Sequence, residues 1–319
     1  MNPSQKISLV MATYNGGEFL REQLDSIYSQ TLLPGEVIVV DDCSKDATVD
    51  ILKEYSLKYG LKYFVNEDNL GVNGNFEKAV SLAKGDYICI SDQDDVWFKD
   101  KIEKTFLKLN EFEKDVPACV SSNVLSVDSD LKNGVLKVKL PKDNEIKEVL
   151  YSNGSQGCTL MFNKKLKEII LPLSKYFIYD HFIGLLSYFV GERFFIEEPL
   201  MYYRHHGGNV VSGRNTRYHK GLSEAMAVYY ILKRKERFYL LKEIQQTKMQ
   251  FINENKKVEL FNLISFYDVD SHLKMFLHVM KNDYYSWQVK LYFFLFLCIL
   301  VFNKDRRVET MSNPLIEAE

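Results

Sequence analysis

The sequence predicts an α/β fold with a parallel sheet, and two observations in its N-terminal part support this. Apolar runs with the length and composition of buried strands lie at 7–13, 36–40, 61–65 and 87–90. Segments with apolar side chains at helical spacing separate them, at 18–30, 46–59 and 74–84. Strands that alternate with helices indicate βαβ units, whose strands run parallel.

Polar segments follow three of these runs. Tyr14 comes after the first run, Asp41 and Asp42 end the second, and residues 92–95 follow the fourth. Right-handed crossovers place the carboxyl ends of parallel strands at one edge of a sheet. Open α/β sheets bind their ligands at that edge. We therefore expect these polar side chains to share one site.

The pattern becomes less regular after residue 110. We expect strands at 116–127 and 157–162, a loop at 141–156, and helices at 180–190 and 221–245. The apolar run at 291–302 is too short to span a bilayer. These features predict a catalytic domain over 1–215 and a helical C-terminal region over 216–319.

Charge is unevenly distributed along the 319 residues. The net charge is −2 overall, with −7 over 1–213 and +7 over 214–310. An acidic front and a basic back indicate two different partners, although chance variation among solvated faces gives the same numbers.

The cysteines support neither a zinc site nor a disulfide framework. They are odd in number and widely spaced, and no two form a C-x-x-C pair: Cys43, Cys89, Cys119, Cys158 and Cys298. The N-terminal residues lack the architecture of a signal peptide. We therefore expect a reducing, cytoplasmic compartment.

The strongest chemical signal is the acidic cluster that contains Asp92, Asp94 and Asp95. Three carboxylates within four residues repel one another, and a divalent cation relieves that repulsion. Hard oxygen ligands favour Mg²⁺ or Mn²⁺, particularly an ion shared with a diphosphate. The alternative is a solvated acidic turn.

Two further segments are suited to binding a nucleotide. Asp41 and Asp42 can accept hydrogen bonds from a base or a ribose, whereas Ser44 and Asp46 fit the capping of the next helix. Tyr14 can stack on a base or pack in the core. The sequence lacks the glycine-rich signatures of dinucleotide-binding dehydrogenases and P-loop enzymes, which argues against both classes.

Together these segments resemble the family 2 glycosyltransferases in order and spacing. The matching segments are 12–15, 39–44, 69–71, 83–87 and 92–95. Segments 91–97, 179–182 and 203–211 resemble the rhamnosyltransferase branch of that family. The resemblance covers about 1–215 and implies a GT-A fold, which is a Rossmann-like open mixed sheet flanked by helices. Cys43 departs from the family pattern, in which glycine is more frequent, and we expect this to affect only the geometry of the turn.

The resemblance also implies roles for individual residues. Tyr14 would stack on the donor base, Asp42 would read its imide N–H, and Asp92 would contact the ribose and diphosphate. Asp94 would hold the metal with Asp95 nearby, and Asp180 would be the catalytic base. Beside these, the resemblance assigns donor or metal contacts to Ala12, Asp41, Asn69, Gln93, Arg204 and His206.

The chemistry independently requires a base outside the metal cluster. The acceptor hydroxyl must lose a proton as it attacks, and a carboxylate within hydrogen-bond reach can take it. Asp180 fits because it begins a predicted helix, although it could instead cap that helix. His205 and His206 could likewise belong to a surface turn.

We therefore expect a metal-dependent, inverting glycosyltransferase of bacterial surface polysaccharide synthesis. The expected donor is dTDP-L-rhamnose, and the alternative donors are a UDP-hexose and a UDP-N-acetylhexosamine. A catalytically silent scaffold that binds sugar nucleotides is the alternative from another class. Retention of Asp92, Asp94, Asp95 and Asp180 argues against that scaffold.

The expected partners follow from these assignments. The acceptor would be a glycan or a lipid-linked glycan, and no nucleic acid is expected. The basic cluster at 233–237 and the apolar run at 291–302 indicate peripheral attachment to the inner face of the cell membrane. Packing on the catalytic domain, or homo-oligomerisation through the C-terminal region, explains the same features.

Overall fold

The computed structural model describes residues 6–136, 156–207 and 235–267, together with Met280, Lys290 and Phe294. The chain divides into two compact units, one of 1–214 with 239–260 and the other of 215–238 with 261–319. The first unit contains every residue predicted above for the site. A boundary between two domains at residue 215 stays a prediction.

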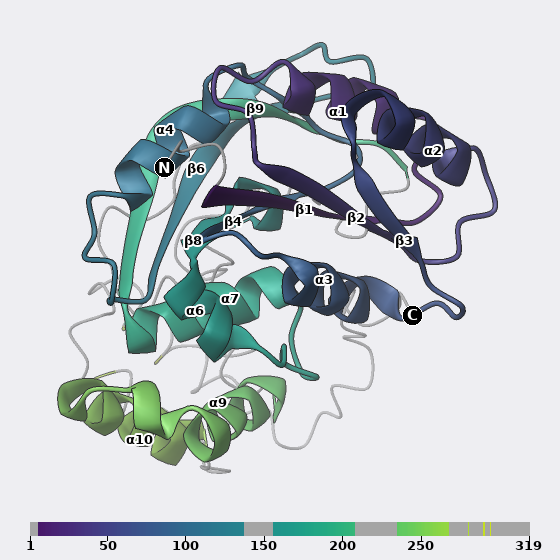
Figure 1. Ribbon diagram of the computed structural model, residues 1–319. Coiled ribbons are helices and arrows are strands. Elements are labelled where there is room, and N and C mark those ends of the chain that lie inside the picture. The colour runs from purple at the N-terminus through teal and green to yellow at the C-terminus, as the bar shows by residue number, and fades with distance from the viewer. Residues whose placement is uncertain are drawn as a thin grey trace. The chain divides into compact units, whose positions relative to one another are not determined.

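A single mixed sheet organises the first unit (Figure 1). Its strands in chain order are β1 (Ile7–Thr13), β2 (Glu36–Asp41), β3 (Lys62–Val65), β4 (Tyr87–Ser91), β5 (Val96–Trp97), β6 (Ala118–Val127), β7 (Val135–Leu136), β8 (Met161–Asn163) and β9 (Glu192–Arg204). Their spatial order is β3-β2-β1-β4-β8-β6-β9-β5, with β7 paired to β6.

The strands predicted from the N-terminal part form the parallel half of the sheet. β1 pairs in parallel with both β2 and β4, and β2 pairs in parallel with β3. β8 then runs antiparallel to β4 and β6, which makes the sheet mixed. This arrangement confirms the predicted α/β class and places the ends of β1, β2 and β4 at one edge.

Beside the sheet, the described residues form eight helices. They are α1 (Leu20–Tyr28), α2 (Thr48–Tyr59), α3 (Gly71–Leu82), α4 (Lys101–Leu109), α6 (Lys164–Ile170), α7 (Tyr179–Val190), α9 (Lys235–Thr247) and α10 (Glu254–Tyr267), with 3-10 turns at Gly157–Thr159 and Met249–Phe251. Figure 1 shows α1, α2 and α4 on one face, and α3, α6 and α7 on the other.

Side chains that alternate along β1 are buried on both faces of the sheet. Ile7, Leu9 and Met11 of β1 share a buried cluster with apolar residues of α1, α2 and α4. Val10, between them in sequence, is also fully buried but lies outside that cluster. Because successive side chains point to opposite faces, a strand buried on both sides is apolar throughout.

The second half of the sheet differs from the prediction. Residues 157–162 were expected to form one strand, but Gly157–Thr159 is a 3-10 turn and the strand begins at Met161. Both the turn and the strand are buried, so an apolar sequence did not distinguish one from the other. The long strand β9 was not predicted, because its three glutamates and Pro199 interrupt any alternating pattern.

Several predicted elements lie outside the described residues. These are the loop at 141–156 except Gln156, most of the helix at 221–245, and nearly all of the apolar run at 291–302. No helix in the described part of the chain is both long and apolar enough to cross a membrane. The four cysteines that the structure describes are free thiols.

Candidate active site

The turn after β2 is fixed by the carboxylate of Asp41. This side chain is fully buried and accepts hydrogen bonds from Thr13 Oγ1 at 3.0 Å and Ser44 Oγ at 2.6 Å. The backbone N–H of Ser44 donates to its other oxygen at 2.9 Å. Asp41 thus ties the ends of β1 and β2 together, and its predicted contact with the donor stays a prediction.

Asp42 holds the loop between β3 and α3. Its Oδ1 accepts from Asn66 Nδ2 and from the N–H of Leu70, both at 2.8 Å, and its Oδ2 accepts from the N–H of Gly71 at 2.9 Å. Asn69 Nδ2 donates to the backbone oxygen of Asp42 at 3.3 Å. Asp42 and Asn69, both predicted to bind the donor, therefore lie side by side at the sheet edge.

Cys43 occupies a position with left-handed backbone geometry. Its φ is +64°, in a region where glycine is favoured, which explains why glycine suits this position. Its Sγ donates to the backbone oxygen of Asn66 at 2.9 Å. Cys43 therefore lies in the turn, and the expectation that it affects only the geometry of that turn stays a prediction.

Tyr14 stands at the end of β1 with its ring half exposed. Gln93 clamps its backbone, because Gln93 Oε1 accepts from Tyr14 N at 2.9 Å and Gln93 Nε2 donates to Tyr14 O at 3.1 Å. A Cβ on Gly16 would lie 2.2 Å from Gln93 Oε1, so the glycine makes room for this clamp. Ala12 pairs with Val40 in the register that leads to this turn.

Asp92 lies close to two other carboxylates, those of Asp94 and Asp180. Burial raises its pKa to about 7, and the negative charges of Asp94 and Asp180 act in the same direction. The hydroxyl of Tyr179 donates to Asp92 Oδ1 at 3.3 Å and partly offsets this effect. Carboxylates from the end of β4 and the start of α7 are thus close enough to repel one another.

Asp95 lies deeper than the rest of the cluster. It is 1% exposed, and its pKa is raised well above the ordinary value by burial and by the charges of Asp94 and Asp92. Its Oδ1 accepts from the N–H of Arg204 at 3.3 Å, whereas its Oδ2 has no hydrogen-bond partner in the described structure. Ligand atoms of Asp92, Asp95 and Cys158 lie within 4.8 Å of one another.

This donor set fits a divalent cation. Buried carboxylates with raised pKa values and an unpaired oxygen are costly without a counter-charge, and a cation supplies one. The predicted metal ligands do not form one group. Asp94 Oδ2 faces His206 Nε2 at 2.8 Å, whereas Asp95 is grouped with Asp92 and Cys158.

Arg204 is buried behind the cluster. Its Nε donates to the backbone oxygen of Asp94 at 2.9 Å, and its terminal nitrogens donate to Ser129 O and to the carboxylate of Glu22. Its guanidinium lies 4.6 Å from the centre of the Phe19 ring. These contacts position the acidic loop, and the predicted role of Arg204 in donor binding stays a prediction.

Asp180 lies in the first turn of α7 and is 8% exposed. Its Oδ1 accepts from the N–H of His181 at 2.7 Å, and its Oδ2 accepts from the N–H of Gly157 at 3.2 Å. A Cβ on Gly157 would lie 1.8 Å from the hydroxyl oxygen of Tyr179, so only glycine fits there. A helix N-terminus favours a negative charge at this position.

Three residues of this site were not among those predicted. Cys158 joins the acidic cluster, Tyr179 bridges towards Asp92, and Asn73 binds the loop before α7. The glycine at 157 next to Cys158 was a signal of close packing, but sequence spacing does not show what packs there.

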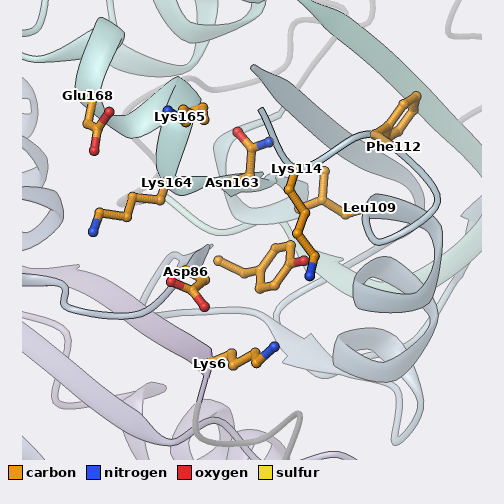
Figure 2. A pocket seen from close by; sticks show the side chains of 10 residues that line it. Lys6, Asp86, Leu109, Phe112, Lys114, Asn163, Lys164, Lys165 and Glu168 are labelled. Carbon is orange, nitrogen blue, oxygen red and sulfur yellow. The ribbon is translucent and has the colours of Figure 1, made fainter. Parts of the chain in front are cut away.

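A separate cavity of about 290 Å³ lies away from this site (Figure 2). It is lined by Lys6, Asp86, Tyr87, Leu109, Phe112, Lys114, Asn163, Lys164, Lys165 and Glu168. Tyr87 begins β4, whereas the acidic cluster follows the other end of that strand. None of the predicted site residues lines this cavity.

The chain is similar to known glycosyltransferases in sequence and in fold. The dTDP-rhamnosyl transferase RfbG of Shigella flexneri is 32% identical over 223 residues, which cover 63% of this chain and 73% of that protein. S. aureus TarS in complex with UDP-GlcNAc superposes with a TM-score of 0.55 at 18% identity, covering 93% of this chain and 92% of that one.

A third comparison involves a mannosyltransferase. PcManGT from Pyrobaculum calidifontis, solved with GDP-Man and Mn²⁺, superposes with a TM-score of 0.51 at 17% identity, covering 94% of this chain and 88% of that one. At such identities the two structural likenesses concern the fold, which is GT-A. The family model described as glycosyl transferase family 2 matches residues 8–170. The chain therefore belongs to glycosyl transferase family 2.

Proposed function

We propose that this chain transfers L-rhamnose from dTDP-L-rhamnose to a hydroxyl of a glycan acceptor, with inversion and with a divalent cation. The proposed product belongs to a bacterial surface polysaccharide. The observation that carries the proposal is the approach of Asp180, from the start of α7, to the acidic cluster after β4. The similarity to RfbG supports rhamnose as the transferred sugar.

The donor would lie across the ends of β1, β2 and β4. The half-exposed ring of Tyr14 offers a stacking surface for the base. Asp42 lies beside it and already accepts three hydrogen bonds, so it would add a fourth from the base. This pocket would be shaped by Ala12, Asp41, Asn69 and Gln93. Arg204 would support donor binding by holding the backbone of Asp94.

Asp94 and His206 would hold the cation on the side of the diphosphate, with Asp92 and Asp95 beneath them. Mn²⁺ or Mg²⁺ bound there would neutralise the charge that develops on the leaving diphosphate. Asp94 and His206 are already 2.8 Å apart, so little rearrangement is needed to bring both ligands to one ion.

Asp180 would take the proton of the acceptor hydroxyl. As the O–H bond breaks, the acceptor oxygen attacks the anomeric carbon from the face opposite the diphosphate. The bond from that carbon to the diphosphate oxygen breaks, and its electron pair leaves with the diphosphate. Backbone N–H groups of Gly157 and His181 hold the carboxylate in place for this step.

Turnover of a panel of nucleotide sugars tests this function. We expect release of nucleotide from dTDP-L-rhamnose when Mn²⁺ or Mg²⁺ is present, and none after addition of a chelator. Turnover of a UDP-hexose or UDP-N-acetylhexosamine instead would favour the alternative donors. Binding without turnover of any donor, in the presence of acceptor-rich membranes, would favour the silent scaffold.

Attachment to a membrane is a separate part of the proposal. The basic cluster at 233–237 and the apolar run at 291–302 would bring the site to a lipid-linked acceptor, from the cytoplasmic side. The full chain should float with anionic vesicles, less so in high salt. A variant with Lys233, Arg234, Lys235 and Arg237 changed to Gln should float less. Equal flotation would instead favour packing or oligomerisation as the role of this region.

A further inference from the structure

Two tyrosines form an exposed stacked pair next to the segment that carries Asp180. The rings of Tyr176 and Tyr239 have centroids 5.5 Å apart and an interplanar angle of 23°. Tyr176 is 50% exposed and Tyr239 is 46% exposed, so each ring covers part of its neighbour and presents its remaining surface to solvent. Aromatic side chains of this size are normally more deeply buried.

The loop that carries Tyr176 is fixed to the functional edge of the sheet. Asn73, in the first turn of α3, donates from Nδ2 to Phe177 O at 2.7 Å and to Ser174 O at 3.2 Å. Its Oδ1 accepts from the N–H of Tyr179 at 2.8 Å. The start of α3 is itself held by Asp42, through Gly71 N, so this loop lies between the predicted donor and base residues.

The helix that carries Tyr239 is fixed to the same loop. Ser174 Oγ donates to Glu243 Oε2 of α9 at 2.6 Å, and the N–H of Tyr176 donates to Ser174 Oγ at 3.1 Å. Lys248 Nζ, one residue after α9, donates to Leu171 O at 3.0 Å. Both rings are therefore mounted on a braced support, which lowers the entropy lost when a ligand is bound.

The distance to the predicted base suits an oligosaccharide. Tyr176 precedes Asp180 by four residues, which span at most about 14 Å when fully extended. A sugar ring on the tyrosines would thus lie within a short oligosaccharide of the attacking hydroxyl. The C–H groups of a pyranose face match the negative face of an aromatic ring.

We propose that the Tyr176–Tyr239 pair is a binding surface for a sugar ring of the acceptor glycan, at a ring other than the one that is attacked. This inference rests on the proposed glycosyl transfer and adds a subsite for the acceptor to it. The pair contributes to the affinity for longer acceptors and leaves donor binding unchanged.

The test uses the full chain and two independent readouts. Saturation-transfer NMR measures the binding of oligosaccharides of one to four rings, made from rhamnose, hexoses or N-acetylhexosamines. Release of nucleotide from the donor in the absence of acceptor measures how the protein uses the donor, independently of oligosaccharide binding. On the scale known for contacts between aromatic rings, Tyr176→Ala or Tyr239→Ala should weaken oligosaccharide binding roughly 2- to 12-fold.

A matched control is present in the same chain. Tyr59 is 42% exposed and stacks on Tyr28 with centroids 4.1 Å apart, but it belongs to α2. Tyr59→Ala should leave oligosaccharide binding unchanged. Tyr176→Phe should keep most of it, because the stacking face remains.

Three results would overturn the proposal: no oligosaccharide binds the wild-type protein at millimolar concentration, neither tyrosine variant weakens binding, or Tyr59→Ala weakens it equally. The first two would assign the pair to packing alone. Absence of donor turnover by the wild-type protein in the presence of acceptor-rich membranes is a different result, which would refute the proposed transfer without deciding the tyrosine surface.

Discussion

The two halves of the candidate site are built in opposite ways. In the donor half, around Asp41 and Asp42, carboxylate oxygens accept hydrogen bonds from neighbouring backbone and side-chain groups. In the acidic half, Asp92 and Asp95 have raised pKa values, and Asp95 Oδ2 has no partner in the described structure. The carboxylates of the donor half are fully hydrogen-bonded as they stand, whereas a cation would balance the charge of the acidic half.

This difference separates two kinds of function. A pocket that is fixed by its own hydrogen bonds can recognise a neutral base without rearrangement. A cluster of repelling carboxylates stores unfavourable energy that binding of a cation releases. Substitutions in the two halves should therefore fail in different ways.

The largest expected effect is on the acidic half. Asp94→Asn removes the carboxylate that faces His206 and should lower turnover by about 10³-fold, since stabilisation of a leaving group by a metal is worth several kcal/mol. Steady-state kinetics across a range of Mn²⁺ concentrations provides the measurement. Wild-type activity that persists in a chelator would contradict this prediction.

Loss of the predicted base should come next. Asp180→Asn should lower turnover by roughly 10²-fold or more while donor affinity stays nearly unchanged. Donor affinity can be measured by titration calorimetry with the nucleotide diphosphate. A collapse of donor affinity would instead make Asp180 a structural residue, consistent with its bond to Gly157 N.

The donor half should show a smaller effect on affinity. In Asp42→Asn, one acceptor oxygen becomes an NH₂ group that faces donors, either Gly71 N or the pair Asn66 and Leu70 N. We expect a rise of about tenfold in donor KM and a loss of about 1–3 kcal/mol in the free energy of unfolding, with kcat little changed. A fall in kcat at unchanged KM would contradict this prediction, because Asp42 would then act in the chemical step and not in donor binding.

The smallest effect concerns the stability of the metal-free protein. The ionised form of Asp92 is disfavoured in the folded state. Stability should therefore fall as the pH rises from the unfolded pKa of about 3.9 to the folded value of about 7. Asp92→Asn should flatten this dependence and raise the melting temperature at neutral pH. A wild-type protein that gains stability over this range would argue against the assignment.

The sequence predicted which strand ends meet at the edge of the sheet better than it predicted what packs against the acidic cluster. Asp42, Asn69 and Gln93 stand at ends of buried strands or in the loops beside them, and β1, β2 and β4 are apolar runs that periodicity identifies. The parallel pairing then brings these ends together by topology alone.

The acidic half depends on contacts that periodicity does not encode. Cys158 reaches Asp92 and Asp95 from a 3-10 turn, and Tyr179 packs on Gly157 across a gap of more than twenty residues. Arg204 turns its charge towards Glu22 and the backbone of Asp94. Each of these follows from tertiary packing of distant segments, which spacing along one chain does not show.

Proton release on binding of Mn²⁺ tests the central claim most directly. Titration calorimetry at pH 7, repeated in buffers with different ionisation enthalpies, measures how many protons leave as the metal binds. Because burial and the neighbouring charges raise the pKa of Asp92 to about 7, its carboxyl is partly protonated at that pH, and a cation bound beside it would favour loss of that proton. The account predicts release of at least about half a proton per ion, and less release in Asp92→Asn. Binding of Mn²⁺ with no proton release, or no binding at all, would contradict it.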